Sequence, residues 1–215
     1  MDTKKYHLEL IYKYFPELSD KQKERYETLW DLYQDWNVKI NVISRKDIDN
    51  LFLHHVMHSL SIYRFMRFQP GSQILDLGTG GGFPGIPLSI VMEDVKWVLI
   101  DGTKKKITVV QDVVEKLELE HVHAYHLRAE EVKLKFDYVV TRAVAELEVL
   151  LKWTRSLLSQ KHRNSRPNGL IALKGGVFKS ELKKLHRSEY TEVVAIQKYF
   201  NEPYFDEKYI VYVQG

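Results

Sequence analysis

The spacing of hydrophobic and polar positions divides the chain into two parts. In the first part, apolar residues recur at helical spacing, and Ser19 with Gln22 three positions later has the form of a capping box at a helix start. Another helix is predicted from near Asp47 to Met66, and Pro70-Gly71 then breaks the pattern. We therefore expect an N-terminal helical extension over residues 1–68.

The second part, residues 69–215, alternates short apolar runs with stretches of helical spacing. Helices are predicted around residues 107–117 and 147–158. Strands are predicted at residues 73–77, 96–100, 122–126, 136–141 and 170–173. The final runs VVAIQKYF and KYIVYV flank a turn with a proline and predict an antiparallel hairpin. Because strands that alternate with helices form parallel βαβ units, we expect a Rossmann-like α/β domain with a mostly parallel sheet.

Composition excludes several classes of protein. The 215 residues are 44% hydrophobic and 28% charged, and no apolar run is long enough to span a membrane. The N-terminal stretch has no signal-peptide pattern. The absence of cysteine excludes disulfides, thiolate zinc sites and a cysteine nucleophile, and it fits the cytoplasmic location that we expect. A net charge of +3 permits a nucleic-acid partner without indicating one.

Glycines gather directly after the first predicted strand. Five of the eleven glycines lie in the eight positions from Gly78 to Gly85. Such a turn lets the backbone approach a ligand closely, and the N-terminus of the following helix offers unpaired N–H groups. A tight turn without a ligand is the alternative, and it fits one isolated glycine better than a cluster of five.

The residues around this loop favour S-adenosylmethionine over a dinucleotide. The run GGGFPG at residues 80–85 satisfies the dinucleotide pattern G-x-G-x-x-G, but Asp76 precedes Gly78 by two positions and gives D-x-G-x-G. In this interpretation Gly78 and Gly80 let the methionine end lie against the loop, and Asp76 orients its ammonium group directly or through water. Asp101, after the next strand, would accept hydrogen bonds from the ribose of either cofactor.

Several segments resemble one family in particular. The run DLGTGGGFPGIPL at residues 76–88 is similar to the signature of the bacterial glucose-inhibited division protein B family. Other segments that match this family in order are residues 36–41, 55–60, 99–105, 128–130, 141–143 and 173–175. His58 departs from the pattern, since the family usually has Asp there, so the role of that Asp cannot be carried over.

The resemblance implies a class I S-adenosylmethionine-dependent methyltransferase that modifies N7 of a guanine in 16S ribosomal RNA. The partner would be that RNA or a precursor of the small ribosomal subunit, and we expect a monomer without membrane attachment. The resemblance also implies that Gly78 and Phe83 border the cofactor and that Asp101 binds its ribose. Ala129 and Glu130 would hold the adenine edge.

Arg142 is the remaining residue that the resemblance assigns, at the end of the fourth strand beside the cofactor and the target base. Guanine N7 carries a lone pair and no proton, so its methylation needs no general base, and alignment of the reacting atoms can supply much of the rate. Because positive charge accumulates on the base, we expect Arg142 to bind phosphate or the guanine O6 edge and to position the RNA.

Three lysines are further candidates for contact with RNA. Lys104 and Lys105 open a helix, where the macrodipole disfavours cations, so they are either phosphate ligands or a solvated charged run. Lys174 ends a strand on the expected ligand rim. For the histidines at 54, 55 and 58, no Glu or Asp in the same segment completes a set of metal ligands, so no metal site is expected.

Two other functions stay open on the sequence alone. The first is a dinucleotide-dependent oxidoreductase, against which Asp76 is the main evidence. The second is a non-catalytic protein that binds RNA or the ribosome and retains the fold.

Overall fold

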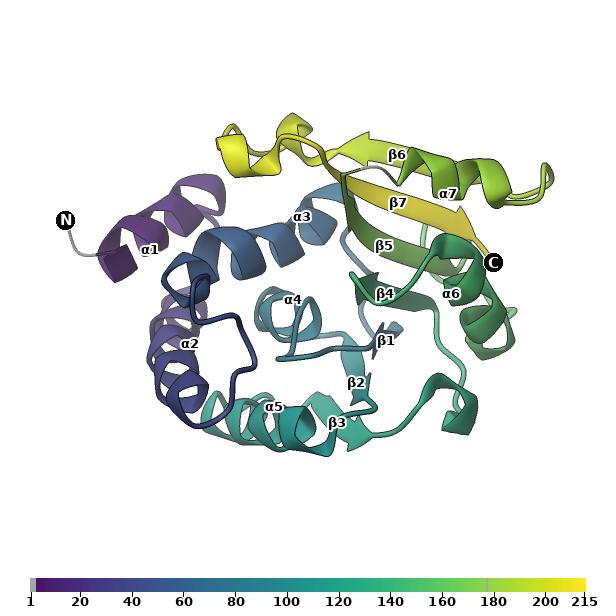
Figure 1. Cartoon of the computed structure of the whole chain (residues 1–215). Helices are drawn as coiled ribbons and strands as arrows, with labels where there is room; N and C mark the ends of the chain where they lie inside the picture. Colours follow the sequence, from purple (N-terminus) through teal and green to yellow (C-terminus); the bar gives the residue numbers. More distant parts are fainter. Residues whose placement is uncertain (1–2, 177) are drawn as a thin grey trace.

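Within the residues that the structure describes, 3–176 and 178–215, seven strands form one sheet in this computed structural model (Figure 1). The strand order is β3-β2-β1-β4-β5-β7-β6, parallel from β3 to β5 and antiparallel on both sides of β7. The strands are β1 (Gln73–Leu77), β2 (Lys96–Asp101), β3 (Val122–His126), β4 (Tyr138–Arg142), β5 (Gly169–Gly175), β6 (Thr191–Ala195) and β7 (Lys208–Gln214). The predicted parallel sheet and the terminal hairpin are both confirmed.

Helices cover both faces of this sheet (Figure 1). One face carries α3, α4 and α5, with α1 and α2 packed outside them, and the other face carries α6 and α7. The helices are α1 (Thr3–Tyr14), α2 (Asp20–Lys39), α3 (His58–Phe65), α4 (Gly85–Val91), α5 (Lys104–Lys116), α6 (Leu147–Thr154) and α7 (Lys179–Lys184). Short 3-10 turns lie at Ile48–Asn50, Ala129–Glu131, Arg155–Leu157, Ile196–Lys198 and Pro203–Phe205.

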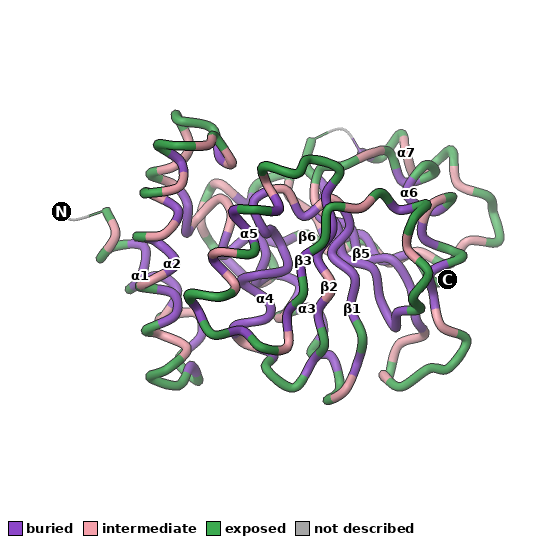
Figure 2. The backbone as a smooth tube through the Cα atoms, turned by 90° about the horizontal axis from the view of Figure 1, so that it is seen from below, coloured by how far each residue is buried: buried purple, intermediate pink, exposed green. Residues whose placement is uncertain are grey.

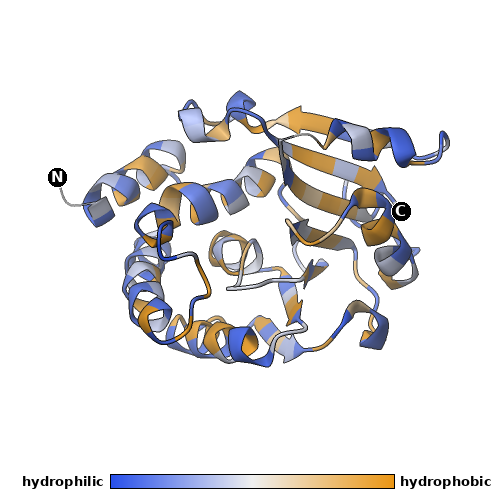
Figure 3. Cartoon of the chain, in the orientation of Figure 1, coloured by the Kyte–Doolittle hydropathy of each residue, from blue (hydrophilic) through white to orange (hydrophobic). Residues whose placement is uncertain are grey.

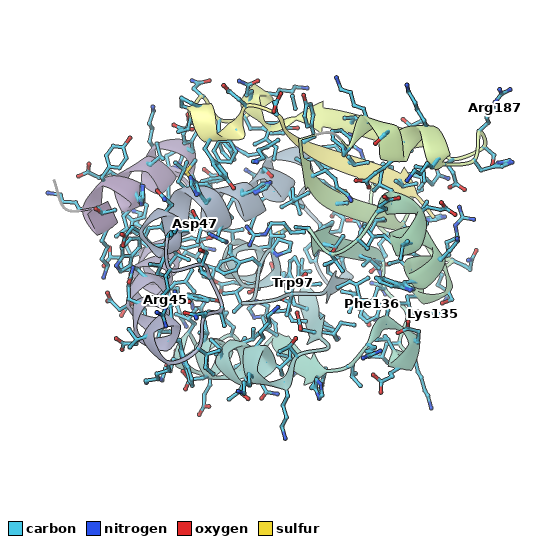
Figure 4. The ribbon with its side chains drawn as sticks, in the orientation of Figure 1. Arg45, Asp47, Trp97, Lys135, Phe136 and Arg187 are labelled. Carbon is cyan, nitrogen blue, oxygen red and sulfur yellow. The ribbon has the colours of Figure 1, made fainter. Side chains whose placement is uncertain are left out.

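The N-terminal helices share their core with the sheet. Ile11 of α1 and Leu29 of α2 belong to the same buried hydrophobic cluster as Trp97 of β2, which is labelled in Figure 4. Figure 2 shows the buried side of α2 turned toward the rest of the molecule. The predicted capping box starts α2, because Ser19 and Gln22 exchange hydrogen bonds between side chain and backbone. A domain boundary at residues 68 and 69 stays a prediction.

Two elements differ from the sequence prediction. The single helix expected over 47–66 is a 3-10 turn, then a π-helical segment at Leu51–Met57, then α3. The run VVAIQKYF is a strand only to Ala195, because the chain then turns and buries Ile196 and Phe200 completely. The hydrophobic pattern alone does not distinguish a buried strand from a buried turn, since both consist of apolar residues.

Hydropathy follows the layers of the fold. The inner strands of the sheet are strongly hydrophobic, whereas α2 is mixed because one side faces solvent (Figure 3). No helix in the described part of the chain is both long and apolar enough to cross a membrane.

Candidate functional site

The glycine loop joins β1 to α4 and forms one wall of the site. Gly78 and Gly80 have φ values of +69° and +59°, in the left-handed region that favours glycine. A Cβ atom at Gly78 would lie 2.5 Å from Cγ2 of Val144, whereas a Cβ atom at Gly80 would have no heavy atom within 4 Å. Gly78 is therefore packed against the protein, and Gly80 faces open space.

Asp76 lies behind this loop and holds it. Its carboxylate is fully buried, and Oδ2 accepts hydrogen bonds from the hydroxyl of Thr79 (2.6 Å) and the backbone N–H of Gly85 (2.8 Å). Oδ1 is buried without a hydrogen-bond partner. Burial raises the pKa of Asp76 to about 7, although both hydrogen bonds favour the ionised form. Asp76 is not among the residues that line the neighbouring cavity, and its predicted contact with an ammonium group stays a prediction.

Helix α2 contacts both this loop and the first turn of α4. The hydroxyl of Tyr33 donates to the carbonyl oxygen of Gly81, and the hydroxyl of Tyr26 donates to that of Pro87 over 2.9 Å. The rings of Tyr33 and Phe83 pack with centroids 5.1 Å apart. The helical extension therefore takes part in shaping the site, through tyrosines that the sequence pattern does not single out for this role.

Asp101 connects the tip of β2 to the same loop. Its Oδ2 accepts a hydrogen bond from the backbone N–H of Gly80 (3.0 Å), and its Oδ1 accepts one from Thr103 N–H (2.8 Å). Each carboxylate oxygen can accept more than one hydrogen bond, so Asp101 keeps acceptor capacity for a ligand. β1, β2 and β4 are parallel neighbours, and their carboxyl ends form one rim, as expected for an open α/β sheet.

Two adjoining cavities open along this rim. The larger has a volume of about 920 Å³ and the smaller about 260 Å³, and both are lined by Gly78, Asp101, Gly102 and Val144. Ala129 and Glu130, which the family resemblance assigns to the adenine edge, line the smaller cavity together with the apolar residues Ile100 and Trp153. A long ligand could therefore pass Asp101 and occupy both cavities.

The larger cavity holds most of the other predicted site residues. Gly80, Phe83, Arg142 and Lys174 line it. The guanidinium carbon of Arg142 lies 5.3 Å from the centre of the Phe83 ring, within the range of a cation–π interaction. The structure thus brings the first and fourth strand ends together, as predicted.

Arg142 is held by the segment that precedes α3. Its Nη1 donates to the carbonyl oxygen of His54 (3.1 Å), and its Nη2 lies 2.8 Å from Nδ1 of His55. The other ring nitrogen of His55, Nε2, lies 2.7 Å from Oδ2 of Asp47. Burial and the charge of Arg142 lower the pKa of His55 to about 4, so the imidazole is neutral at neutral pH.

The predicted lysines occupy different environments. Lys174 is buried, and its ammonium group donates to the carbonyl oxygen of Ala145 (2.6 Å) and the carboxylate of Glu181 (2.8 Å). Lys104 and Lys105 are exposed in the first turn of α5 and line neither cavity. Whether these three lysines bind RNA stays a prediction.

Sequence reasoning missed two residues near the end of the chain. Tyr204 and Lys208 line the larger cavity. The Tyr204 ring stacks on His54 with centroids 3.8 Å apart and planes 14° apart, and Lys208 lies over its face at 5.2 Å. No local motif marks these residues, because they reach the site only through the position of β7 beside β5.

His58 also lines the larger cavity. It is buried, and its Nε2 has no hydrogen-bond partner. Burial and the charges of Arg142 and Lys208 lower its pKa. Among the described residues, no cluster of three or more histidine or acidic side chains could hold a metal ion.

The sequence matches a family model described as rRNA small subunit methyltransferase G over residues 22–202. A protein of that name from Bacteroides thetaiotaomicron is 47% identical over 207 residues, which cover 96% of this chain and 100% of the relative. A protein of the same name from Porphyromonas gingivalis is 49% identical over 95% of this chain and 92% of its own length.

Solved structures give the same fold at low sequence identity. The crystal structure of a SAM-dependent methyltransferase from Aquifex aeolicus aligns with a TM-score of 0.52 and 19% identity. The alignment covers 72% of this chain and 88% of that one.

Proposed function

This chain belongs to the rRNA small subunit methyltransferase G family, also called GidB, and we propose that it transfers a methyl group from S-adenosylmethionine to N7 of a guanine in 16S ribosomal RNA. The resemblance to the glucose-inhibited division protein B family is thereby confirmed. The fold is that of a class I S-adenosylmethionine-dependent methyltransferase.

The pair of cavities that share Asp101 is the observation that carries this proposal. Asp101 would accept hydrogen bonds from the ribose hydroxyls at the junction, and the adenine would occupy the smaller cavity beside Ala129 and Glu130. The methionine end would lie in the larger cavity against Gly78 and Gly80. This larger cavity leaves room for a base that is turned out of its stack.

The chemistry requires alignment more than proton transfer. Bound S-adenosylmethionine supplies a methyl group on a cationic sulfur. The lone pair of guanine N7 forms the new N–C bond, the electrons of the broken C–S bond stay on sulfur, and the positive charge moves to the base. No proton has to leave N7, so no residue of the chain is assigned as a general base. The task of the protein is to hold N7 in line with the methyl group.

Arg142 is the residue that we assign to positioning the RNA. Its guanidinium lines the larger cavity at the end of β4 and can donate a forked pair of hydrogen bonds to a phosphate or to the guanine O6 edge. A cation there does not assist the methyl step itself, because positive charge builds up on the base. Lys104, Lys105 and Lys174 would add phosphate contacts around the same rim.

Labelled methyl transfer tests the proposal. Incubation of the protein with isotopically labelled S-adenosylmethionine and small-subunit ribosomal RNA that lacks the modification should place label on the RNA, and digestion should release 7-methylguanosine. Labelled RNA with a different methylated nucleoside would refute the N7 assignment, and no label at all would indicate a non-catalytic binder. A thermal-shift measurement distinguishes the methyltransferase from the oxidoreductase alternative. S-adenosylhomocysteine should raise the melting temperature of the protein, and NAD should not.

We also infer that the protein acts as a monomer in the cytoplasm, where small ribosomal subunits and their RNA are found. Light scattering of the purified chain at working concentration would check the oligomeric state, and a dimer mass would contradict this part of the proposal.

A further inference from the structure

We propose that Asp47 and His55 are positioning residues for the methyl transfer, because they hold the guanidinium of Arg142 in the larger cavity without neutralising its charge. This inference rests on the proposed function of Arg142. It concerns a three-residue chain of contacts, Asp47–His55–Arg142, in which the residues come from the segment before α3 and from the end of β4.

The geometry fixes the tautomer of His55. Arg142 has only hydrogen-bond donors, so the His55 Nδ1 atom that lies 2.8 Å from its Nη2 must accept. A neutral imidazole with an acceptor at Nδ1 carries its proton at Nε2. This proton points to Oδ2 of Asp47, 2.7 Å away, and the carboxylate accepts it. Asp47 therefore selects the tautomer in which His55 can hold the arginine.

Asp47 is itself anchored at its other oxygen. Oδ1 lies 2.5 Å from Nδ1 of His54, so the carboxylate contacts both neighbouring imidazoles. Asp47 is labelled in Figure 4. His54 and His55 both lie in the π-helical segment Leu51–Met57, and the carboxylate of Asp47 contacts both of these consecutive residues. π-helical turns of this kind occur often at functional sites.

A second neutral acceptor completes the arrangement around Arg142. Nη1 donates to the carbonyl oxygen of His54 (3.1 Å), which also accepts from the hydroxyl of Tyr204 (3.2 Å). Within the described residues, no carboxylate forms an ion pair with Arg142. Both contacts thus fix the direction of the side chain while its positive charge stays available.

The contact of Arg142 with a neutral imidazole differs electrostatically from a direct ion pair with a carboxylate. A carboxylate in contact with the guanidinium would compete with an RNA phosphate or with guanine O6 for the same donors. Here the negative charge of Asp47 stands one imidazole away, and Arg142 loses rotamer freedom before RNA arrives. A preorganised donor lowers the cost of forming the reactive complex.

Two amide substitutions at His55 separate the two halves of this contact chain. In His55→Asn, the amide oxygen can take the place of Nδ1 and accept from Arg142, but the contact with Asp47 is lost. In His55→Gln, the amide nitrogen can take the place of Nε2 and donate to Asp47, but the acceptor for Arg142 is lost. The two variants have similar polarity, so each is a control for the other.

The measurement is kcat/KM for methyl transfer to small-subunit RNA, with cofactor affinity from calorimetry. We expect His55→Gln to lose about tenfold or more in kcat/KM and His55→Asn to lose clearly less, since a hydrogen bond to a charged group is stronger than one between neutral groups. Cofactor affinity should stay within about threefold of wild type in both variants. Equal losses in both variants, or a larger loss in His55→Asn, would overturn the proposal.

A double-mutant cycle excludes a purely structural effect. In the background of Arg142→Ala, the substitution His55→Gln should have little further effect on kcat/KM if His55 acts through the arginine. An undiminished further loss would show that His55 acts by another route.

A spectroscopic test keeps this inference separate from the proposed function. Nitrogen NMR of the imidazole in the full chain should show a protonated Nε2 and an unprotonated Nδ1 in His55, and Asp47→Ala should disturb this pattern. The opposite tautomer in the wild-type protein would refute the inference even if methyl transfer is observed. The expected tautomer in a protein without methyl transfer would instead leave the contact chain intact and refute the proposed function.

Discussion

Asp101 and Gly80 are joined by a hydrogen bond of 3.0 Å from the glycine N–H to the carboxylate Oδ2. The contact fixes the end of β2 against the loop that follows β1, at the junction of the two cavities. The carboxylate is therefore oriented before a ligand arrives, and its remaining lone pairs can accept hydrogen bonds from the ribose that we propose it binds.

The first prediction concerns this carboxylate. Asp101→Ala should weaken S-adenosylhomocysteine binding by about tenfold to a hundredfold, because charge-assisted hydrogen bonds to the ribose are lost. Calorimetry measures the affinity, and Glu115→Ala, which removes an exposed carboxylate from α5, is the matched control. Unchanged affinity in Asp101→Ala would place the nucleoside elsewhere.

The second prediction concerns Arg142. It lines the larger cavity and not the smaller one, so Arg142→Ala should reduce kcat/KM for RNA much more than it reduces cofactor affinity. Arg142→Lys should recover little of the loss, because a single ammonium group cannot keep the contacts of both Nη1 and Nη2. An equal loss of cofactor affinity and of methyl transfer would contradict this separation of roles.

The third prediction uses the raised pKa of Asp76. Oδ1 has no partner, and burial raises the pKa to about 7, so part of the protein carries a protonated carboxyl at neutral pH. The positive charge of S-adenosylmethionine nearby would lower this pKa. Binding at about pH 6.5 should therefore release a fraction of a proton, which appears in calorimetry as a dependence of the binding heat on the ionisation enthalpy of the buffer.

Asp76→Asn is the control for that measurement, because it cannot titrate and can still accept hydrogen bonds with its amide oxygen. The same variant tests stability. The pKa of Asp76 rises from 3.8 to about 7 on folding, so the native state binds more protons than the unfolded chain between these values. This term makes the free energy of unfolding fall as pH rises through that window, and urea titrations should show a smaller fall in Asp76→Asn. Identical slopes would indicate that Asp76 is ionised throughout.

The fourth prediction compares two glycines. Gly78→Ala places Cβ 2.5 Å from Val144 in addition to its positive φ, so it should destabilise the fold more than Gly80→Ala. Gly80→Ala meets no protein atom and should cost only about 1–2 kcal/mol of backbone strain. It should nevertheless weaken cofactor binding, because its methyl group enters the open space of the site. Thermal unfolding and calorimetry together separate these effects, and unimpaired binding by Gly80→Ala would contradict the assignment.

The fifth prediction concerns the anchor of the helical extension. Arg25 of α2 is buried, and it donates to the carbonyl oxygens of Leu117 (2.9 Å) and Glu118 (3.0 Å) after α5 and to the carboxylate of Glu93. Arg25→Ala should destabilise the protein by about 2–4 kcal/mol, since it leaves these groups unpaired. Urea unfolding measures the loss, with the exposed Lys21→Ala as control. A change of similar size in both variants would show that the buried contacts contribute little.

Local patterns in the sequence predicted the short buried strands and the glycine loop. The strands that end at Leu77 and Asp101 are short and apolar. The glycines and Asp76 mark the loop after the first of these strands as a binding loop, because a tight turn without a ligand does not need so many glycines beside an acidic residue. The placement of Asp101 and Arg142 on one rim follows from parallel strand order alone. These features depend on neighbours in sequence or on a general rule of topology.

The contacts around Arg142 could not be predicted in this way. Arg142 and His55 are 87 positions apart, and His54 and Tyr204 are 150 apart. The ion pair of Lys174 also comes from tertiary structure, because Glu181 lies beside it on the first turn of α7. In the sequence, Lys174 looks like a free cation on the rim, and only the packing of α7 against the sheet reveals its ionic partner.

The position of β7 has a consequence for how the protein is made. This strand comes last in the chain but lies between β5 and β6, and the turn just before it brings Tyr204 onto His54. During translation, the wall of the larger cavity therefore stays incomplete until residues 208–214 have left the exit tunnel. A nascent chain can pair β1 to β5 before this point, but Lys208 joins the wall of the larger cavity only when β7 pairs with β5.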